Sequence, residues 1–233
     1  MFFMIYSFFG WFLETAFASA LEKRYINRGF LIGPFTPIYG FGAILIIFTL
    51  NSFDFSNQQL FIKHISFFIF STLLMTLLEF ITGIILEKIF HSKWWDYSKN
   101  AYNFKGYVCL KYSLIWGGLS FLLIQIVHPI IQQMVHMIPD AKVEFIIILF
   151  ILYFVFDTLI SVIGALDLRK VILHYSDISV ELYKEKILKY KRFFFAFPKL
   201  LILNAHVFNH DIRSILYGRI DKIKVEFKNR FLN

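Results

Sequence analysis

Five long apolar stretches follow one another along the first three quarters of the chain. They are continuous rather than alternating, which favours helices over the strands of a membrane barrel. A helix needs about 20 mainly apolar residues to cross a hydrocarbon core of about 30 Å. The pattern therefore predicts membrane-spanning helices at Phe2–Leu21, Phe30–Leu50, Ile65–Leu86, Tyr107–Ile131 and Phe145–Leu166.

Positive charge is concentrated after the last of these stretches. Residues 169–233 hold 14 Lys or Arg and 6 Asp or Glu, whereas residues 1–168 hold 10 of each kind. Basic segments beside a membrane face the cytoplasm and attract anionic lipid head groups. We therefore expect a transmembrane domain over 1–168 and a basic, helical cytoplasmic tail over 169–233. The first and third connections are also the basic ones, so the N-terminus is predicted outside.

Composition supports this division and excludes several classes of protein. The chain is 58% hydrophobic and 17% charged, whereas a soluble domain averages about 25% charged residues. A soluble or disordered protein is therefore excluded, and a single cysteine excludes a disulfide scaffold. We find no motif for a catalytic centre, a metal or a cofactor, and the basic tail is explained by the bilayer rather than by nucleic acid.

The sequence also contains an internal duplication. Phe12-Leu13-Glu14 matches Leu77-Leu78-Glu79 at an offset of 65, and a Leu-Glu-Lys follows each glutamate eight residues later. At an offset of 77, Arg28-Gly29-Phe30 matches Lys105-Gly106-Tyr107, and Ile38-Tyr39-Gly40 matches Ile115-Trp116-Gly117. These matches predict two parallel helix hairpins, repeat 1 at about 2–50 and repeat 2 at about 65–131, followed by a fifth helix at about 145–166.

Glu14 and Glu79 are the strongest candidates for a functional site. Eight helical residues place each about 12 Å from the end of its helix, and thus near the middle of the bilayer. Charged side chains at this depth are costly and usually face the protein interior. We expect the two carboxyl groups, with Asp157 nearby, to line a polar cavity that binds a cation or carries a proton. The alternative is that each protonated carboxyl hydrogen-bonds a neighbouring helix.

A second candidate site lies at the start of each outward helix. Arg28–Pro37 contains two glycines and two prolines, so the second helix is expected to begin irregularly or to restart near Pro37. A basic residue beside a helix N-terminus favours an anion. Arg28 and Lys105 are thus predicted to bind a phosphate or carboxylate, including a lipid head group, at the inner mouth. Simple anchoring by the positive-inside rule is the alternative.

Two further expectations concern residues outside the spans. Trp94, Trp95 and Tyr97 are predicted to form an interfacial belt, with Asp96 paired to a neighbouring lysine. In the tail, helices are expected at 177–191 and at 211–231. The segment 192–203 between them is too short to span, and is expected either to lie in the membrane interface or to dock on the bundle.

Several motifs resemble those of one known family. They are Tyr6–Glu14, Asn27–Gly40, Trp95–Ser98, Asn103–Gly106 and Ala196–Pro198. Together they are similar to the CmpB-type family of small bacterial integral membrane proteins, named as ABC transporter permeases of type IV. The resemblance implies a protein of the bacterial inner membrane that transports a solute, with a separate ATPase subunit as a partner.

The sequence as a whole thus predicts an all-α, polytopic helix bundle. The leading function is transport of a small or lipidic solute, with binding residues Glu14, Glu79, Asp157, Arg28 and Lys105. A membrane enzyme acting on a lipid-linked substrate, or a non-catalytic scaffold, is the alternative. The expected partners are the bilayer, anionic lipid head groups, and either an ATPase subunit or a second copy of the chain.

Overall fold

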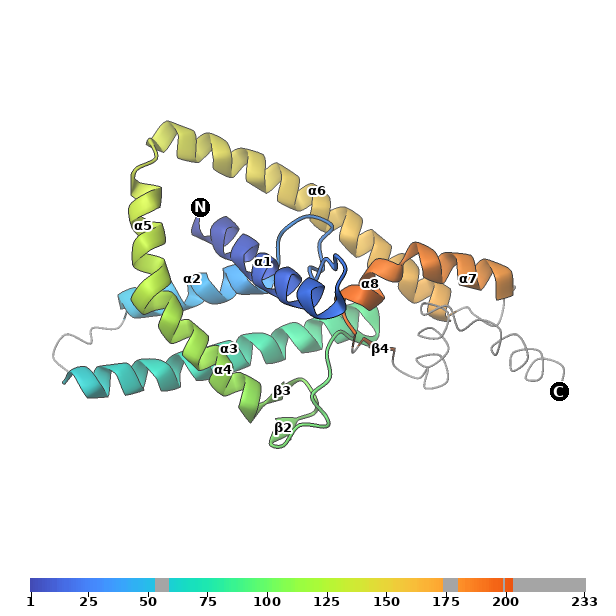
Figure 1. Cartoon of the computed structure of the whole chain (residues 1–233), viewed down its shortest axis with the longest axis horizontal. Helices are drawn as coiled ribbons and strands as arrows, with labels where there is room; N and C mark the ends of the chain where they lie inside the picture. Colours follow the sequence, from blue (N-terminus) through green and yellow to red (C-terminus); the bar gives the residue numbers. More distant parts are fainter. Residues whose placement is uncertain (53–58, 174–179, 199, 203–233) are drawn as a thin grey trace.

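The computed structural model describes residues 1–52, 59–173, 180–198 and 200–202, and its long elements are all helices (Figure 1). The helices are α1 (Phe2–Glu22), α2 (Pro37–Ser52), α3 (Leu60–Phe90), α4 (Leu110–Leu122), a π-helical turn (Leu123–Val127), α5 (His128–His136), α6 (Asp140–Leu173), α7 (Val180–Lys189) and α8 (Lys191–Ala196). The strands have two residues each: β1 (Ser92–Lys93), β2 (Asn103–Phe104), β3 (Val108–Cys109) and β4 (Leu201–Ile202). The predicted all-α bundle is confirmed.

Within the described residues, four helices are long and apolar enough to cross a membrane: α1, α3, the continuous run Leu110–His136 and α6. The second predicted span, Phe30–Leu50, is shorter than expected. Its helix begins only at Pro37, because the glycine- and proline-rich residues before it form bends rather than helix. The 16 residues of α2 extend about 24 Å, which is less than a hydrocarbon core of about 30 Å.

The fourth span continues through a proline. Pro129 has no backbone N–H, and its ring would clash with the carbonyl four residues earlier in a regular helix. The π-helical turn Leu123–Val127 lies directly before it and connects α4 to α5 without a break. A local widening of the helix thus accommodates the proline and lets the span extend to His136.

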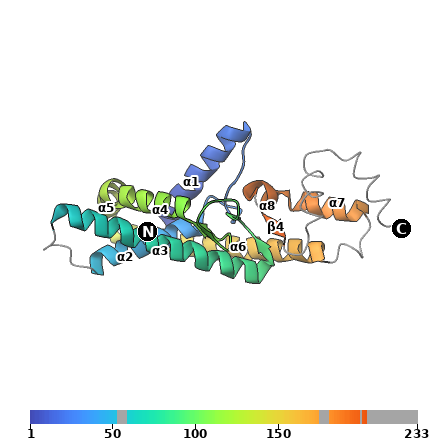
Figure 2. The same ribbon diagram turned by 90° about the horizontal axis from the view of Figure 1, so that it is seen from below.

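Helices α1 and α2 form one pair, and α3 and α4 form a second pair. In each pair a glycine allows the two helices to approach closely. A Cβ on Gly40 of α2 would lie 2.2 Å from Ser7 Oγ and 2.8 Å from Phe3, both on α1. A Cβ on Gly117 of α4 would lie 2.0 Å from Thr72 Oγ1 and 3.1 Å from Phe68, both on α3. The two sets of contacts follow the offsets of 65 and 77 seen in the sequence. Figure 2 shows α1 inclined away from α3 and α6.

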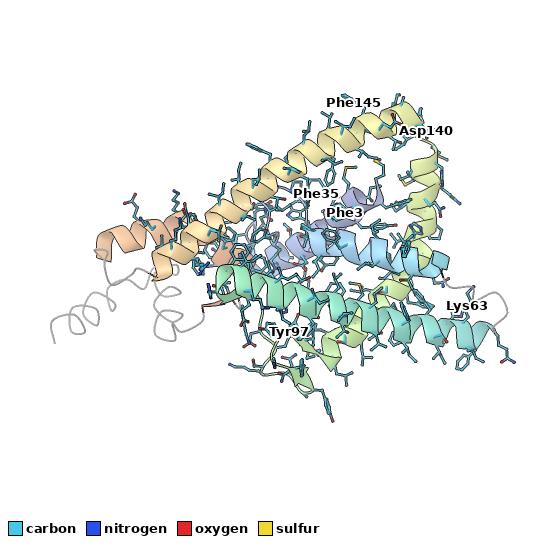
Figure 3. All side chains as sticks on the ribbon, turned by 180° about the vertical axis from the view of Figure 1, so that it is seen from behind. Phe3, Phe35, Lys63, Tyr97, Asp140 and Phe145 are labelled. Atoms are coloured by element: carbon cyan, nitrogen blue, oxygen red, sulfur yellow. The ribbon has the colours of Figure 1, made fainter. Side chains whose placement is uncertain are left out.

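Aromatic side chains connect α6 to the first pair. Phe3 lies 5.5 Å from Phe154 between ring centroids, and Phe35 lies 5.1 Å from Phe150. Figure 3 shows Phe3 and Phe35 in the space between α2 and α6. α6 also continues without a break past residue 168, into the region assigned to the tail.

The segment after α7 docks on the bundle, which is one of the two arrangements expected for residues 192–203. Phe193 of α8 is 3% exposed and packs against Trp94, with ring centroids 5.7 Å apart. β4 pairs antiparallel with β1, which fixes the same segment to the chain just after α3. Trp94 is 5% exposed in this cluster, so its predicted place in an interfacial belt is wrong. The helix expected at 211–231 lies outside the described residues.

The close approach of α3 and α4 at Gly117 gives a direct test of the packing. We expect Gly117→Ala to lower the stability of the chain in detergent by ~1–3 kcal/mol, because the new methyl group overlaps the Thr72 side chain. Gly118→Ala is the matched control, since nothing lies within 4 Å of its Cβ position. Thermal unfolding of both variants measures the difference. Equal melting temperatures for the two would contradict the close packing.

Candidate functional site

Glu14 faces the interior of the first helix pair. The Tyr39 hydroxyl on α2 donates a hydrogen bond of 2.6 Å to Glu14 Oε1. Arg28 Nε lies 3.9 Å from Glu14 Oε2, and the two side chains are 27% and 35% exposed respectively. This carboxylate therefore has both a neutral donor and a cationic partner.

Glu79 is the corresponding residue of the second pair, and it is more deeply buried. Its exposed fraction is 5%, and the Tyr97 hydroxyl donates a hydrogen bond of 3.0 Å to its Oε1. Trp116 of α4 lies close enough to interact with the carboxyl, although no hydrogen bond reaches Oε2. Burial raises the pKa of Tyr97, which therefore remains a hydrogen-bond donor at neutral pH. Figure 3 shows Tyr97 in the segment that follows α3.

Aromatic side chains connect the two glutamates. The rings of Tyr39 and Trp116, which occupy matching positions in the repeats, meet edge to face with centroids 5.3 Å apart. Tyr39 and Tyr97 are also close enough to interact electrostatically. Glu14 and Glu79 are thus at opposite ends of one polar-aromatic cluster, which we call the central cluster: Glu14, Arg28, Tyr39, Glu79, Tyr97 and Trp116.

Asp157 lies elsewhere, in contact with the loop that precedes α2. The backbone amides of Ile32 and Gly33 each donate a hydrogen bond of 2.9 Å to its carboxylate. Tyr153 and Ser161 on the same helix donate further bonds of 3.3 Å. A Cβ on Gly33 would lie 2.8 Å from Asp157 Oδ2, so the absence of a side chain permits this approach. The Asp157 carboxylate therefore already accepts hydrogen bonds from the loop N–H groups that a bound anion would need.

A residue of the tail donates hydrogen bonds to the carbonyl groups of the same loop. Arg192 of α8 donates hydrogen bonds of 2.7 Å to the Leu31 carbonyl and 3.1 Å to the Phe30 carbonyl. Burial lowers the pKa of Arg192, while the nearby charge of Asp157 acts in the opposite direction. Arg28 in turn donates to the carbonyl of Ala196. Loop and tail thus exchange hydrogen bonds in both directions.

Asn27 sets the path of the chain from α1 into this loop. Its Oδ1 accepts hydrogen bonds of 2.8 Å from Trp11 Nε1 and from the Gly29 amide. Its Nδ2 donates to the Ile32 carbonyl at 2.8 Å. The Asn27 side chain thus hydrogen-bonds backbone groups of a segment that has no regular secondary structure. These bonds fix the path of the chain and place Arg28 beside Glu14.

Lys105 lies away from the central cluster. It is exposed, has a positive φ of 52°, and its ammonium is 5.8 Å from the Phe104 ring centroid. The nearby Asp96 accepts hydrogen bonds from the amide and hydroxyl of Ser98. The predicted pairing of Asp96 with a lysine is therefore wrong, because this carboxylate closes a turn instead. Across the described parts of the chain, His, Cys, Asp and Glu form no group of three that could hold a metal.

Sequence reasoning did not identify four residues of this arrangement as functional: Tyr39, Tyr97, Trp116 and Arg192. Tyr39 and Trp116 stood at matching positions of the repeat, which was the available signal. Arg192 directly precedes three phenylalanines, and this apolar run was the only indication in the sequence that its side chain is partly buried.

We expect Arg192→Ala to lower stability by about 1.5–3 kcal/mol, because two loop carbonyls lose a charged donor. Thermal unfolding in detergent and cleavage of α8 by chymotrypsin measure the effect. Lys191→Ala removes an exposed neighbour and serves as the control. If the two variants behave alike, Arg192 does not hold the loop.

The comparison with known families agrees with the resemblance seen in the motifs. No solved structure matches the chain. The model of a family described as Putative ABC-transporter type IV matches residues 1–162, which include α1 to α5 and most of α6. The matched part contains both glutamates of the central cluster and Asp157. The chain therefore belongs to the Putative ABC-transporter type IV family, which makes it a membrane protein of a transporter-type family.

Proposed function

We propose that the chain is the membrane-embedded permease component of a transporter for a small or lipidic solute. The observation that carries this proposal is the central cluster, in which two helix pairs each contribute a glutamate to one polar network. Membership of a transporter-type family and four apolar helices of spanning length support the same function. Polar residues inside a bundle of spanning helices commonly mark the path of a solute or ion.

Glu14 and Glu79 are the proposed binding groups, and Arg28, at the start of the loop before α2, lies beside Glu14. An irregular segment inside a membrane protein is tolerated only where it is buried in protein or faces water. The loop therefore suits the inner end of a solute path. We propose that Asp157 acts on this path indirectly, by holding the loop, and that Lys105 attracts anionic head groups at the inner surface.

The proposed setting is the bacterial inner membrane, with the N-terminus outside and the basic tail in the cytoplasm. The distribution of Lys and Arg supports this orientation. A separate ATPase subunit is the proposed energy source, following from the family. A homo-oligomer remains an alternative assembly.

Uptake into membrane vesicles tests the proposal. Vesicles from cells that express the full chain are supplied with ATP and a panel of labelled organic cations, organic anions and short-chain phospholipids. We expect at least one compound to accumulate above vesicles without the chain. Glu14→Gln and Glu79→Gln are expected to reduce this uptake about tenfold or more, since Glu14 loses a charged hydrogen bond worth ~1.5–3 kcal/mol and Glu79 loses its ionisable group.

Glu22→Gln is the matched control, because Glu22 lies at the exposed end of α1. Its uptake is expected to equal that of the unmodified chain. Folded Glu14→Gln and Glu79→Gln variants with normal uptake would remove the two carboxyl groups from the solute path. The absence of uptake for every compound would favour a scaffold or an enzyme.

A further inference from the structure

The two glutamates of the central cluster differ in one respect that the repeat does not predict. Glu14 has a cationic partner, since Arg28 Nε lies 3.9 Å from its carboxylate. For Glu79, no Lys or Arg nitrogen of the described residues lies within 4.0 Å. Its Oε2 is buried and has no hydrogen-bond partner. Equivalent carboxyl groups thus occupy different electrostatic environments.

The difference arises in the loops that follow each first helix. Lys105 corresponds to Arg28 at the offset of 77. The second copy has about twelve additional residues before this position, and they form the turns around Asp96 and the β2–β3 hairpin. Lys105 lies on the exposed side of that hairpin, and its ammonium lies near Phe104. The longer loop therefore does not place a cationic side chain beside Glu79.

The phenol of Tyr97 and the indole of Trp116 are the side chains that interact with Glu79. Tyr97 donates to it from the loop and stacks on Tyr112 of α4, with centroids 4.6 Å apart. Tyr97 also interacts with Cys109, at the start of α4, and with Tyr39 on α2. Two cations lie near these partners: Arg28 is paired with Glu14, and Lys111 lies over the Tyr112 ring, with its ammonium 5.8 Å from the centroid.

We propose that Glu79 is a site for one exchangeable proton, whereas Glu14 is the ion-pair partner of Arg28. The proposal deepens the proposed function, because it makes Glu79 the position at which transport would couple to protons. A buried carboxylate without a cation is costly, and a neutral carboxyl avoids that cost. On release, the O–H bond breaks, the proton passes to water and the carboxylate remains; binding reverses this step. A hard metal cation fits less well, since it requires six or more oxygen ligands, and the side chains that interact with Glu79 are one phenol and one indole.

Difference infrared spectroscopy of the full chain in lipid vesicles tests this assignment. We expect the C=O stretch of a protonated carboxylic acid, with a shift when H2O is replaced by D2O. The band should be lost in Glu79→Gln and retained in Glu14→Gln. Glu79→Asp, which keeps the acid but shortens the side chain, should shift the band rather than remove it. This second variant keeps the test valid if Glu79→Gln does not fold.

A band that survives in Glu79→Gln, a band insensitive to D2O, or no band at all would overturn the proposal. The measurement needs no solute, so it is separate from the uptake experiment. If the band is present and no compound is transported, the proton site stands and the permease function fails. If uptake depends on Glu79 and the band is absent, transport stands and the proton site fails.

Discussion

The arrangement depends on how the backbone of residues 29–36 is satisfied. This segment lies between two apolar helices and forms no regular secondary structure, so its polar groups need partners from elsewhere. Asp157 of α6 accepts from its amides, and Arg192 of α8 donates to its carbonyls. Two charged side chains of opposite sign therefore hold one short loop from its two sides. The position of Arg28, and with it the ion pair to Glu14, follows from this arrangement.

This constraint also assigns a structural role to the beginning of the tail. Residues 169–233 were separated from the transmembrane part by charge alone, and that division remains a prediction. Within the described residues, however, α8 contributes buried side chains and hydrogen bonds to the same loop that α6 holds. The charge pattern identified the basic character of the tail correctly, but it contained no information about packing.

Apolar patterning was sufficient to predict the helices, because length and hydropathy determine whether a segment can span a bilayer. It also indicated the irregular start of α2, since Gly33 and Pro34 oppose a helix and Pro37 suits its first turn. The candidate site was predicted only in part. Glu14 and Glu79 were located from their depth, but depth does not reveal partners. Asp157 was grouped with them as a third acid within a span, and Lys105 was matched to Arg28 through the repeat. Hydrogen bonding instead places Asp157 on the loop, and the longer second loop leaves Lys105 exposed.

The contacts of Phe30 link the two repeats close to where α3 ends. Its ring meets Trp94, which follows α3, with centroids 5.0 Å apart, and Phe193 of α8 at 6.0 Å. A displacement of α8 would therefore push on both hairpins at once rather than on the first alone. Phe30 thus joins the contacts of Trp94 and β1 in linking α8 to the bundle, so motion applied to the tail would be divided between the two helix pairs.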